Sequence, residues 1–325
     1  MTSENIRAIW LLVSPVGVDD VQLVRCRTVL TPATGFLYAY THSLNPYMGC
    51  AFGDGGCGVY CYVAESPIGL YAGKPWGQWV KAKINAAEAL RSDLEKLSNR
   101  HALRVFMSSA TDPYQPAEAR LRITRSILEV FAEYPVGVLV VQTRSPLVER
   151  DFDLLSHMPF AWLSMTLETD DDKVRRALTP TCPSTERRFK TMRVARGHGI
   201  HVQAAVSPTL PHSHDRFAEL LVEAADRVIV DTFFGDGSDG KRTARRPLPQ
   251  RFHHLGFGNW RDVAAAERLH RTLLERMRRE RVGWSRDGFN ELALAAADQA
   301  AFTKCDLPEP VAKAACYPRA DTNSC

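Results

Sequence analysis

The central part of the chain alternates between short apolar runs and longer stretches with apolar residues at helical spacing. A continuous apolar run is typical of a strand that is buried on both faces. The clearest such run is the valine-rich stretch 136–143. By the same criterion, we predict core strands over 36–42, 103–108, 136–143, 161–168, 200–206 and 227–233, with an extended piece over 21–30.

The stretches between these strands carry helix signals. Residues 184–197, for instance, have Ser184 as a candidate N-cap, while Gly197 and Gly199 can end the helix. The predicted helices cover 76–98, 116–134, 147–157, 184–197, 215–225 and 259–281, with one more over 289–304. Strands that alternate with helices pair in parallel through right-handed crossovers. The pattern therefore predicts an α/β fold, an open or partial (β/α)6 barrel.

The element pattern also suggests how the chain is organised. We expect an N-terminal extension over 1–35, the barrel core over 36–260 and a C-terminal helical extension over 261–325. With 45% hydrophobic and 24% charged residues, the 325-residue chain has an ordinary globular composition. Its formal net charge of +4 permits an anionic partner but does not demand one. Because no apolar run approaches a membrane span, we expect a cytoplasmic protein without membrane contact.

Three of the eight cysteines lie close together in a glycine-rich stretch, at C-x6-C-x3-C spacing: Cys50, Cys57 and Cys61. Eight cysteines in a chain of this length are too sparse for a disulfide scaffold, so the cluster indicates metal use in a reducing compartment. Three thiolates can hold three irons of a cubane cluster and leave the fourth iron open for a ligand. A zinc site would want a fourth ligand and usually a tight cysteine pair, and unrelated thiols are the third interpretation.

Polar residues follow the predicted strands. Ser109, Thr111 and Asp112 come after the second strand and Arg144 after the third. In a barrel these strand ends converge, which makes them the expected place for a site. Near the end of the fourth strand, alternation puts Ser164, Thr166 and Glu168 on one face, which suits hydroxyls directed at a ribose. The competing interpretation is structural, since Asp112-Pro113 can simply initiate a turn.

Three motifs together resemble one family. They are SLNPY-x-GC with Tyr60-Cys61-Tyr62, TDPYQP-x-E followed by TR, and PSTERR. This set resembles the radical S-adenosylmethionine (SAM) enzymes, specifically the spore photoproduct lyase-like branch, over roughly residues 44–260. The cysteine loop of that family is usually C-x3-C-x2-C with an aromatic residue before the third cysteine. Here both gaps are longer, and the aromatic residue is kept as Tyr60.

The resemblance implies a radical SAM partial barrel in which Cys50, Cys57 and Cys61 bind a 4Fe-4S cluster whose open iron chelates SAM. One electron, from a donor such as flavodoxin or ferredoxin, would then cleave SAM to a 5′-deoxyadenosyl radical that abstracts hydrogen from an unknown substrate. Arg188 would reach the carboxylate of SAM. The cofactor-binding residues expected from the resemblance are Tyr60, Tyr62, Ser109, Thr111, Asp112, Arg144, Ser164, Thr166 and Arg188.

The other cysteines give weaker signals. Cys182 follows the fourth predicted strand and is a candidate hydrogen donor, although a lone cysteine is more often a small packing residue. Cys305, Cys316 and Cys325 could bind an auxiliary cluster, but the last residue of a chain makes a poor ligand. The lesion-repair members carry a hydrogen-donating cysteine near the end of the second strand, where this chain has Met-Ser-Ser-Ala at 107–110. Direct repair of thymine photoproducts is therefore not supported.

A second class of function stays open at this point. The stretched loop could belong to an iron–sulfur or zinc binding protein that does not cleave SAM and associates with nucleic acid. The arginine-rich stretch 261–283 could lie along a nucleic acid backbone, but its interleaved acidic residues favour a salt-bridged outer helix. Only the enzyme should release 5′-deoxyadenosine.

Overall fold

The computed structural model describes residues 21–53, 56–235 and 238–302. Most of the expected N-terminal extension, the end of the helix expected over 289–304 and the three tail cysteines Cys305, Cys316 and Cys325 lie outside the described residues. Within the described residues, no helix combines the length and the apolar character needed to cross a bilayer.

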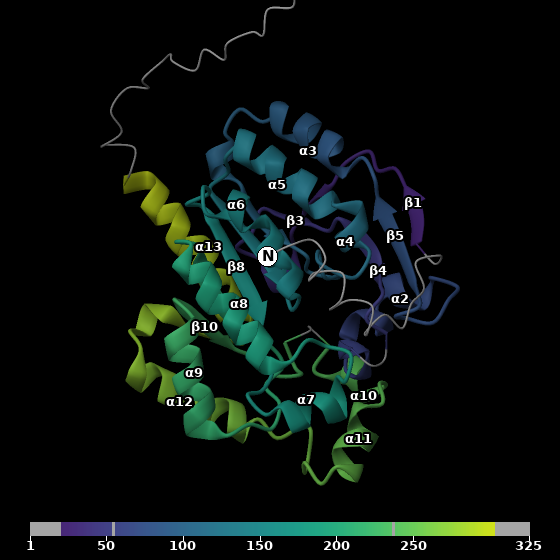
Figure 1. Ribbon diagram of the computed structural model, residues 1–325, viewed down its shortest axis with the longest axis vertical. Coiled ribbons are helices and arrows are strands. Elements are labelled where there is room, and N and C mark those ends of the chain that lie inside the picture. Colours follow the sequence, from purple (N-terminus) through teal and green to yellow (C-terminus); the bar gives the residue numbers. More distant parts are fainter. Residues whose placement is uncertain (1–20, 54–55, 236–237, 303–325) are drawn as a thin grey trace, which may run out of the picture.

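A curved sheet of eight strands forms the centre of the described chain (Figure 1). Across the sheet the order is β11, β10, β9, β8, β7, β6, β3 and β2. Neighbours from β3 to β11 pair in parallel, and β2 pairs antiparallel with β3. The strands are β2 (Leu30–Pro32), β3 (His42–Leu44), β6 (Arg104–Met107), β7 (Val138–Thr143), β8 (Ala161–Thr166), β9 (His201–Val206), β10 (Arg227–Val230) and β11 (Val282–Trp284). The predicted parallel α/β architecture is confirmed.

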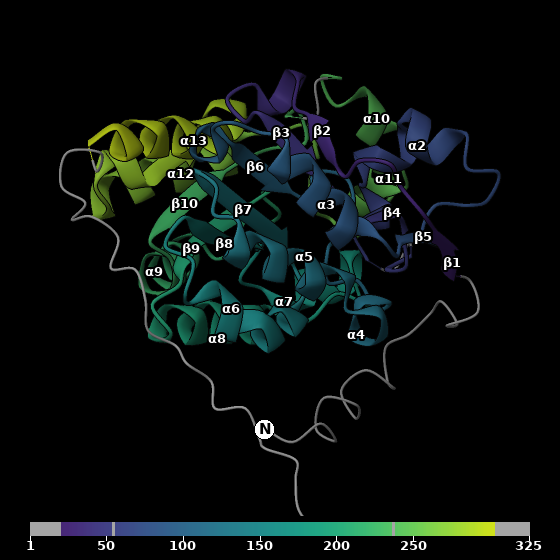
Figure 2. The same ribbon diagram turned by 90° about the horizontal axis from the view of Figure 1, so that it is seen from above.

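Helices follow most of the parallel strands. Figure 2 shows α6 and α8 on one side of the sheet and α13 on the other. The helices are α2 (Pro67–Leu70), α3 (Ala86–Glu95), α4 (Glu118–Leu121), α5 (Ile123–Glu133), α6 (Phe152–Leu155), α7 (Asp172–Leu178), α8 (Thr185–Gly197), α9 (His214–Ala224), α10 (Lys241–Ala244), α11 (Leu248–His254), α12 (Ala264–Arg276) and α13 (Ser285–Phe302).

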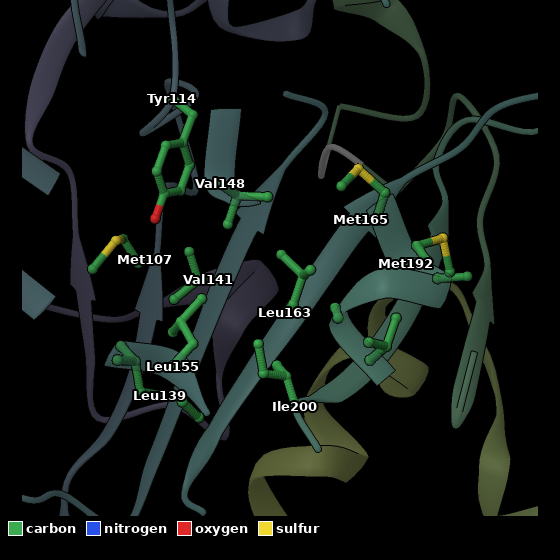
Figure 3. Close-up of a cluster of buried hydrophobic side chains, with 14 of the residues drawn as sticks. Met107, Tyr114, Leu139, Val141, Val148, Leu155, Leu163, Met165, Met192 and Ile200 are labelled. Carbon is green, nitrogen blue, oxygen red and sulfur yellow. The ribbon is translucent and has the colours of Figure 1, made fainter. Parts of the chain in front are cut away.

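Alternation along β7 explains the continuous apolar run that predicts it. Leu139 and Val141 face the outer core, where they lie beside Leu155 of α6 and Val148 (Figure 3). Val138 and Val140 point the other way, into an inner core. Both faces of the strand are therefore buried against apolar side chains, which is why its sequence does not alternate between apolar and polar residues.

The inner core is filled by a helix from the C-terminal part of the chain. Phe289, Leu292 and Ala293 of α13 belong to the same buried cluster as Phe106 and Ile229 of the sheet. The expected C-terminal extension thus supplies both an edge strand, β11, and the helix inside the curve of the sheet.

The predicted strand over 36–42 is wrong. The chain forms a short 3-10 helix over Gly35–Leu37, and the strand β3 begins only at His42. Gly35 has a φ of +63°, which interrupts an extended backbone. The amide of Ala39 donates to Asn290 Oδ1 of α13 at 2.8 Å instead of joining a ladder.

The predicted start of the helix over 76–98 is also wrong. Trp79–Lys83 is a strand, β5, and α3 begins at Ala86. In a second sheet, β5 lies between β1 (Val21–Val24) and β4 (Tyr47–Cys50). Because Cys50 is the last residue of β4 and lies opposite Trp79, this unforeseen sheet fixes the start of the cysteine loop.

Candidate active site

A cavity of about 550 Å³ lies at the carboxyl ends of the parallel strands, bounded by the cysteine loop and the inner end of α13. This is the position that the predicted barrel assigns to a site. Its lining includes Cys50, Cys57, Tyr60, Cys61, Tyr62, Ser109, Thr111, Asp112, Arg144, Thr166, Asp231 and Phe289. Residues from distant parts of the described chain therefore line the same cavity.

The three loop cysteines all line this cavity despite their long spacing. The interaction between the Cys57 and Cys61 thiols is the largest cause of a raised pKa at Cys57 and a lowered pKa at Cys61. Burial raises the pKa of Cys50, whose sulfur accepts a hydrogen bond from the Phe52 amide at 3.4 Å. The thiol with the lowered pKa, Cys61, is the one most disposed to ionise.

The donor set fits an iron–sulfur cluster. Thiolates are the usual ligands of such clusters, and hydrogen bonds from backbone amides tune their reduction potential. The Phe52 amide donates such a bond to the Cys50 sulfur at 3.4 Å, and the backbone of Ala64 and Val63 acts together with Cys57 to lower the pKa of Cys61. In the described part of the chain, no three His, Cys, Asp or Glu side chains form a ready site for a single metal ion.

Distant elements anchor the cysteine loop. Ala51 N donates to Gln115 Oε1 at 3.1 Å, and Thr181 Oγ1 donates to the Phe52 carbonyl at 3.1 Å. Arg246 donates twice to the Gly58 carbonyl, from Nε at 2.9 Å and from Nη2 at 2.7 Å. The loop is thus held from the end of β6, from the segment after α7 and from the segment after α10.

The close packing of the loop also requires glycine. A Cβ atom on Gly77 would lie 2.4 Å from the Cα atom of Gly53, and Gly77 has a φ of +90°. Any larger residue at Gly77 would push the cysteine loop away from its support.

Glu168, just beyond β8, joins the loop to two buried arginines. Its Oε1 accepts from Tyr60 Oη at 2.9 Å and from Arg144 Nη1 at 2.7 Å, while its Oε2 accepts from Arg188 Nη1 at 2.6 Å. Burial acts to raise the pKa of Glu168, but the charges of Arg188 and Arg144 outweigh it and lower the pKa to about 2. The carboxylate is therefore ionised and fixes Tyr60, the residue before Cys61.

Asp112 bridges the ends of β6 and β7 at the cavity wall. Its carboxylate accepts hydrogen bonds from Thr143 Oγ1 at 2.6 Å, from the Tyr114 amide at 2.8 Å and from the Arg144 amide at 2.9 Å. Burial raises the pKa of Asp112 in spite of these bonds. An acceptor held in this way can receive a donor group from a ligand in the cavity.

The neighbouring predicted residues also lie on the wall. Thr111 Oγ1 donates to the Tyr47 carbonyl at 3.1 Å. Tyr62 Oη donates to the Ser109 carbonyl at 2.9 Å and so links the cysteine loop to the loop after β6.

Three predicted residues lie off the cavity lining. Ser164 is buried between Gln142 and Gln203, with which it forms hydrogen bonds. Arg188 is fully buried against Glu168, and among the described residues its Nε and Nη2 atoms have no hydrogen-bond partner. Cys182 is buried with its sulfur 3.6 Å from Arg144 Nη1. The roles assigned to these three stay predictions.

The sequence patterns gave a signal for some further residues of the site but not for others. Glu168 shares the alternating face of Ser164 and Thr166, and Asp231 directly follows the strand β10. Arg246 and Phe289 had no signal, because only the fold brings residues so far along the chain beside the cysteine loop or cavity.

Comparison with known proteins agrees with this geometry. Residues 44–229 match the sequence model of the radical SAM superfamily. An uncharacterised protein of Methanocaldococcus jannaschii is 30% identical over 169 residues, which cover 52% of this chain and 60% of that protein. A radical SAM Nalpha-GlyT isomerase of Pseudomonas phage M6 is 26% identical over 180 residues, which cover 55% of this chain and 34% of that protein. The chain thus matches less than two thirds of either relative's length.

A solved structure resembles the fold. Spore photoproduct lyase complexed with dinucleoside spore photoproduct superposes with a TM-score of 0.56 and 13% identity, over 82% of this chain and 81% of that one. At this identity the likeness concerns the fold alone. Together with the matched family model, it leads to one conclusion: the chain belongs to the radical SAM superfamily.

Proposed function

We propose that the protein is a radical SAM enzyme in which Cys50, Cys57 and Cys61 hold a 4Fe-4S cluster and SAM occupies the adjoining cavity. The observation that carries the proposal is that three thiols at C-x6-C-x3-C spacing line one cavity at the carboxyl ends of the strands. When bound, the cluster and SAM supply one-electron cleavage of the sulfonium to methionine and a 5′-deoxyadenosyl radical for hydrogen abstraction.

The residues of the cavity wall suit the polar groups of SAM. Asp112, held by Thr143 and two backbone amides, is an acceptor for the amino group. Arg144 offers donors for the carboxylate while it stays paired with Glu168, and Thr166 offers a hydroxyl for the ribose. Ser109 and Thr111 complete the polar wall beside Asp112.

Apolar side chains surround the cysteine loop. Phe52, Val63 and Trp76 are buried in one cluster with Cys50, and Tyr60 packs edge-on against Phe233 with ring centroids 5.9 Å apart. Such a surround excludes water from the loop, which protects a reactive radical from side reactions.

The far side of the cavity is the proposed substrate site. There Asp231 accepts hydrogen bonds from Ser207 Oγ at 2.9 Å and Ser285 Oγ at 2.8 Å, next to the apolar surface of Phe289 and Phe36. This part of the cavity offers a hydrogen-bond acceptor beside an apolar surface. The substrate itself is unidentified.

The test is anaerobic reconstitution with iron and sulfide, followed by dithionite reduction with SAM and chromatography of the products. We expect about four irons per chain and release of 5′-deoxyadenosine. Alanine at Cys50, Cys57 or Cys61 should abolish both. Cys26→Ala is the matched control, because Cys26 lies beside Asn85 at the second sheet, away from the cavity lining. Bound zinc, or a cluster that never cleaves SAM, would overturn the proposal and favour a binding protein.

A further inference from the structure

A strongly basic segment lies between the strands β10 and β11. Residues 240–261 contain six Lys or Arg residues and two His, with no Asp or Glu. On α10, Thr243 is buried and lines the cavity, while Lys241 is exposed, as is Arg245 directly after the helix. The charges of Lys241 and Arg245 are therefore turned to solvent.

This segment touches the loop that carries the cysteines. Arg246 donates to the carbonyl of Gly58, which lies between Cys57 and Cys61, and its side chain is 15% exposed. The side chain of Arg246 thus links the middle of the cysteine loop to a partly exposed position on the basic segment. A molecule bound over Arg246 would be close to any group that the three cysteines hold.

Exposed apolar residues adjoin the basic segment. Leu70 is 58% exposed and Tyr71 is 86% exposed, with Ile68 and Tyr62 beside them at 39% each. Both α2 and α10 contact the turn at Tyr62–Glu65, and Figures 1 and 2 both draw them as neighbours. We name Tyr62, Ile68, Leu70, Tyr71, Lys241, Arg245 and Arg251 the loop-side face.

The cations of this face are not neutralised internally. Among the described residues, Lys241, Arg245 and Arg251 form no ion pair. Acidic residues of the described chain at the margin include Glu65, which pairs with Arg246 at 3.4 Å, and Asp239, which is exposed. On α12, by contrast, Arg276 is paired with Asp215 and Glu219.

We propose that the loop-side face is the docking surface for a small acidic electron-carrier protein with a flavin or an iron–sulfur cluster. An apolar centre edged by unpaired charge suits a transient protein partner of opposite charge. The inference rests on the proposed function, in which each cleavage consumes one electron from outside. The carrier is oxidised by one electron, the cluster is reduced by one, and that electron enters the breaking carbon–sulfur bond of SAM.

Nucleic acid is the competing occupant, because phosphates also seek unpaired Lys and Arg. The exposed aliphatic side chains of Ile68 and Leu70 favour a protein, since backbone phosphates offer them no partner. The basic segment also contacts Gly58 of the cysteine loop through Arg246. A carrier docked there would be close to the cluster that it reduces.

The experiment compares two reductants of the reconstituted protein. Photoreduced bacterial flavodoxin is the probe, and stopped-flow bleaching of the cluster absorbance is the readout. In the Lys241→Glu/Arg245→Glu variant we expect the bleaching rate with flavodoxin to fall about tenfold or more at low salt. Leu70→Ser should also slow it. Added NaCl should slow the wild type. The dithionite-driven yield of 5′-deoxyadenosine should not change in these variants.

The matched control is Arg268→Glu/Arg271→Glu, since both residues are exposed on α12, which both ribbon views draw away from α10. The proposal is overturned if flavodoxin reduces both double variants equally, or if the wild type shows no salt-dependent reduction. It is also overturned if the Lys241→Glu/Arg245→Glu variant keeps its rate and loses only affinity for a fluorescent single-stranded oligonucleotide. Failure of the wild type to release 5′-deoxyadenosine with dithionite would instead refute the proposed function.

Discussion

At the scale of single residues, the buried carboxylate of Glu168 joins the cysteine loop to two arginines of the core. It is 2% exposed, and it meets one guanidinium on each carboxylate oxygen as well as the phenol of Tyr60. Removal of one partner from a buried ion pair leaves the other charge uncompensated in a poor solvent. Glu168 is thus a positioning residue that stabilises the fold through Arg188 and the cysteine loop through Tyr60.

Glu168→Gln should lower the free energy of unfolding of the apoprotein by about 3–5 kcal/mol at neutral pH. Urea denaturation measures this change. Asp153→Asn is the control, because the pair of Asp153 with Arg125 has a carboxylate that is 57% exposed. Its loss should be at most about 1 kcal/mol. Equal losses in the two variants would show that Glu168 does not act as argued.

The same carboxylate predicts a pH dependence. The pKa of Glu168 is lowered from its ordinary value of 4.5 to about 2. A lowered folded-state pKa gives stability that is present above 4.5 and is lost as the pH falls towards 2. The wild type should therefore lose up to about 3 kcal/mol through this group in acid. Denaturation curves from pH 7 to pH 3 should show the gap between wild type and Glu168→Gln narrowing below about pH 5. A constant gap would contradict the assignment.

At the scale of elements, α13 fills the space inside the curved sheet. Asn290 is fully buried and ties α13 to the segment after β2, accepting from the Ala39 amide at 2.8 Å and donating to the Phe36 carbonyl at 2.7 Å. These bonds replace the ladder that a strand over 36–42 would have formed.

Asn290→Ala should destabilise the protein by about 2–3 kcal/mol, because it leaves the buried Ala39 amide and the partly buried Phe36 carbonyl without these partners. Hydrogen exchange followed by mass spectrometry should show faster exchange over residues 36–40. Leu294→Ala on the same helix is the control, since Leu294 is 48% exposed. A similar loss in both variants would mean that only helix packing matters at this position.

The elements also show how far sequence reasoning extends. Strands such as β7 were predictable because both of their faces are buried, so that their sequence is a continuous apolar run. This signal lies within the strand itself. The strand β5 was missed because Trp79 and Ile84 mimic helical spacing, although Ile84 is 46% exposed. Asp112, Arg144 and Asp231 line the cavity because each follows a parallel strand, which is also a local signal. Arg246 and Phe289 could not be predicted, since only the folded chain gives them their neighbours.

At the scale of the whole molecule, the cysteine loop depends on contacts from far along the chain. Arg246 lies 188 positions from Gly58, whose carbonyl it holds. This long-range contact ties the middle of the loop to the segment after α10.

Arg246→Gln should reduce the iron retained after reconstitution by about half or more, because the loop loses two charge-assisted hydrogen bonds. Iron and sulfide assays measure this loss, and circular dichroism should show an intact fold. Arg245→Gln is the control, since Arg245 is exposed and makes no bond to the loop among the described contacts. Full iron content in Arg246→Gln would mean that the loop holds its shape alone.

The distance from Gly58 to Arg246 also bears on how the protein is made. On the ribosome the three cysteines emerge well before Arg246 and Phe289 of the cavity floor, which lie far later in the sequence. During that interval the thiols lack both neighbours. If the three cysteines hold the proposed cluster, its insertion follows the synthesis of Arg246 and Phe289, and the thiols need protection from oxygen until then.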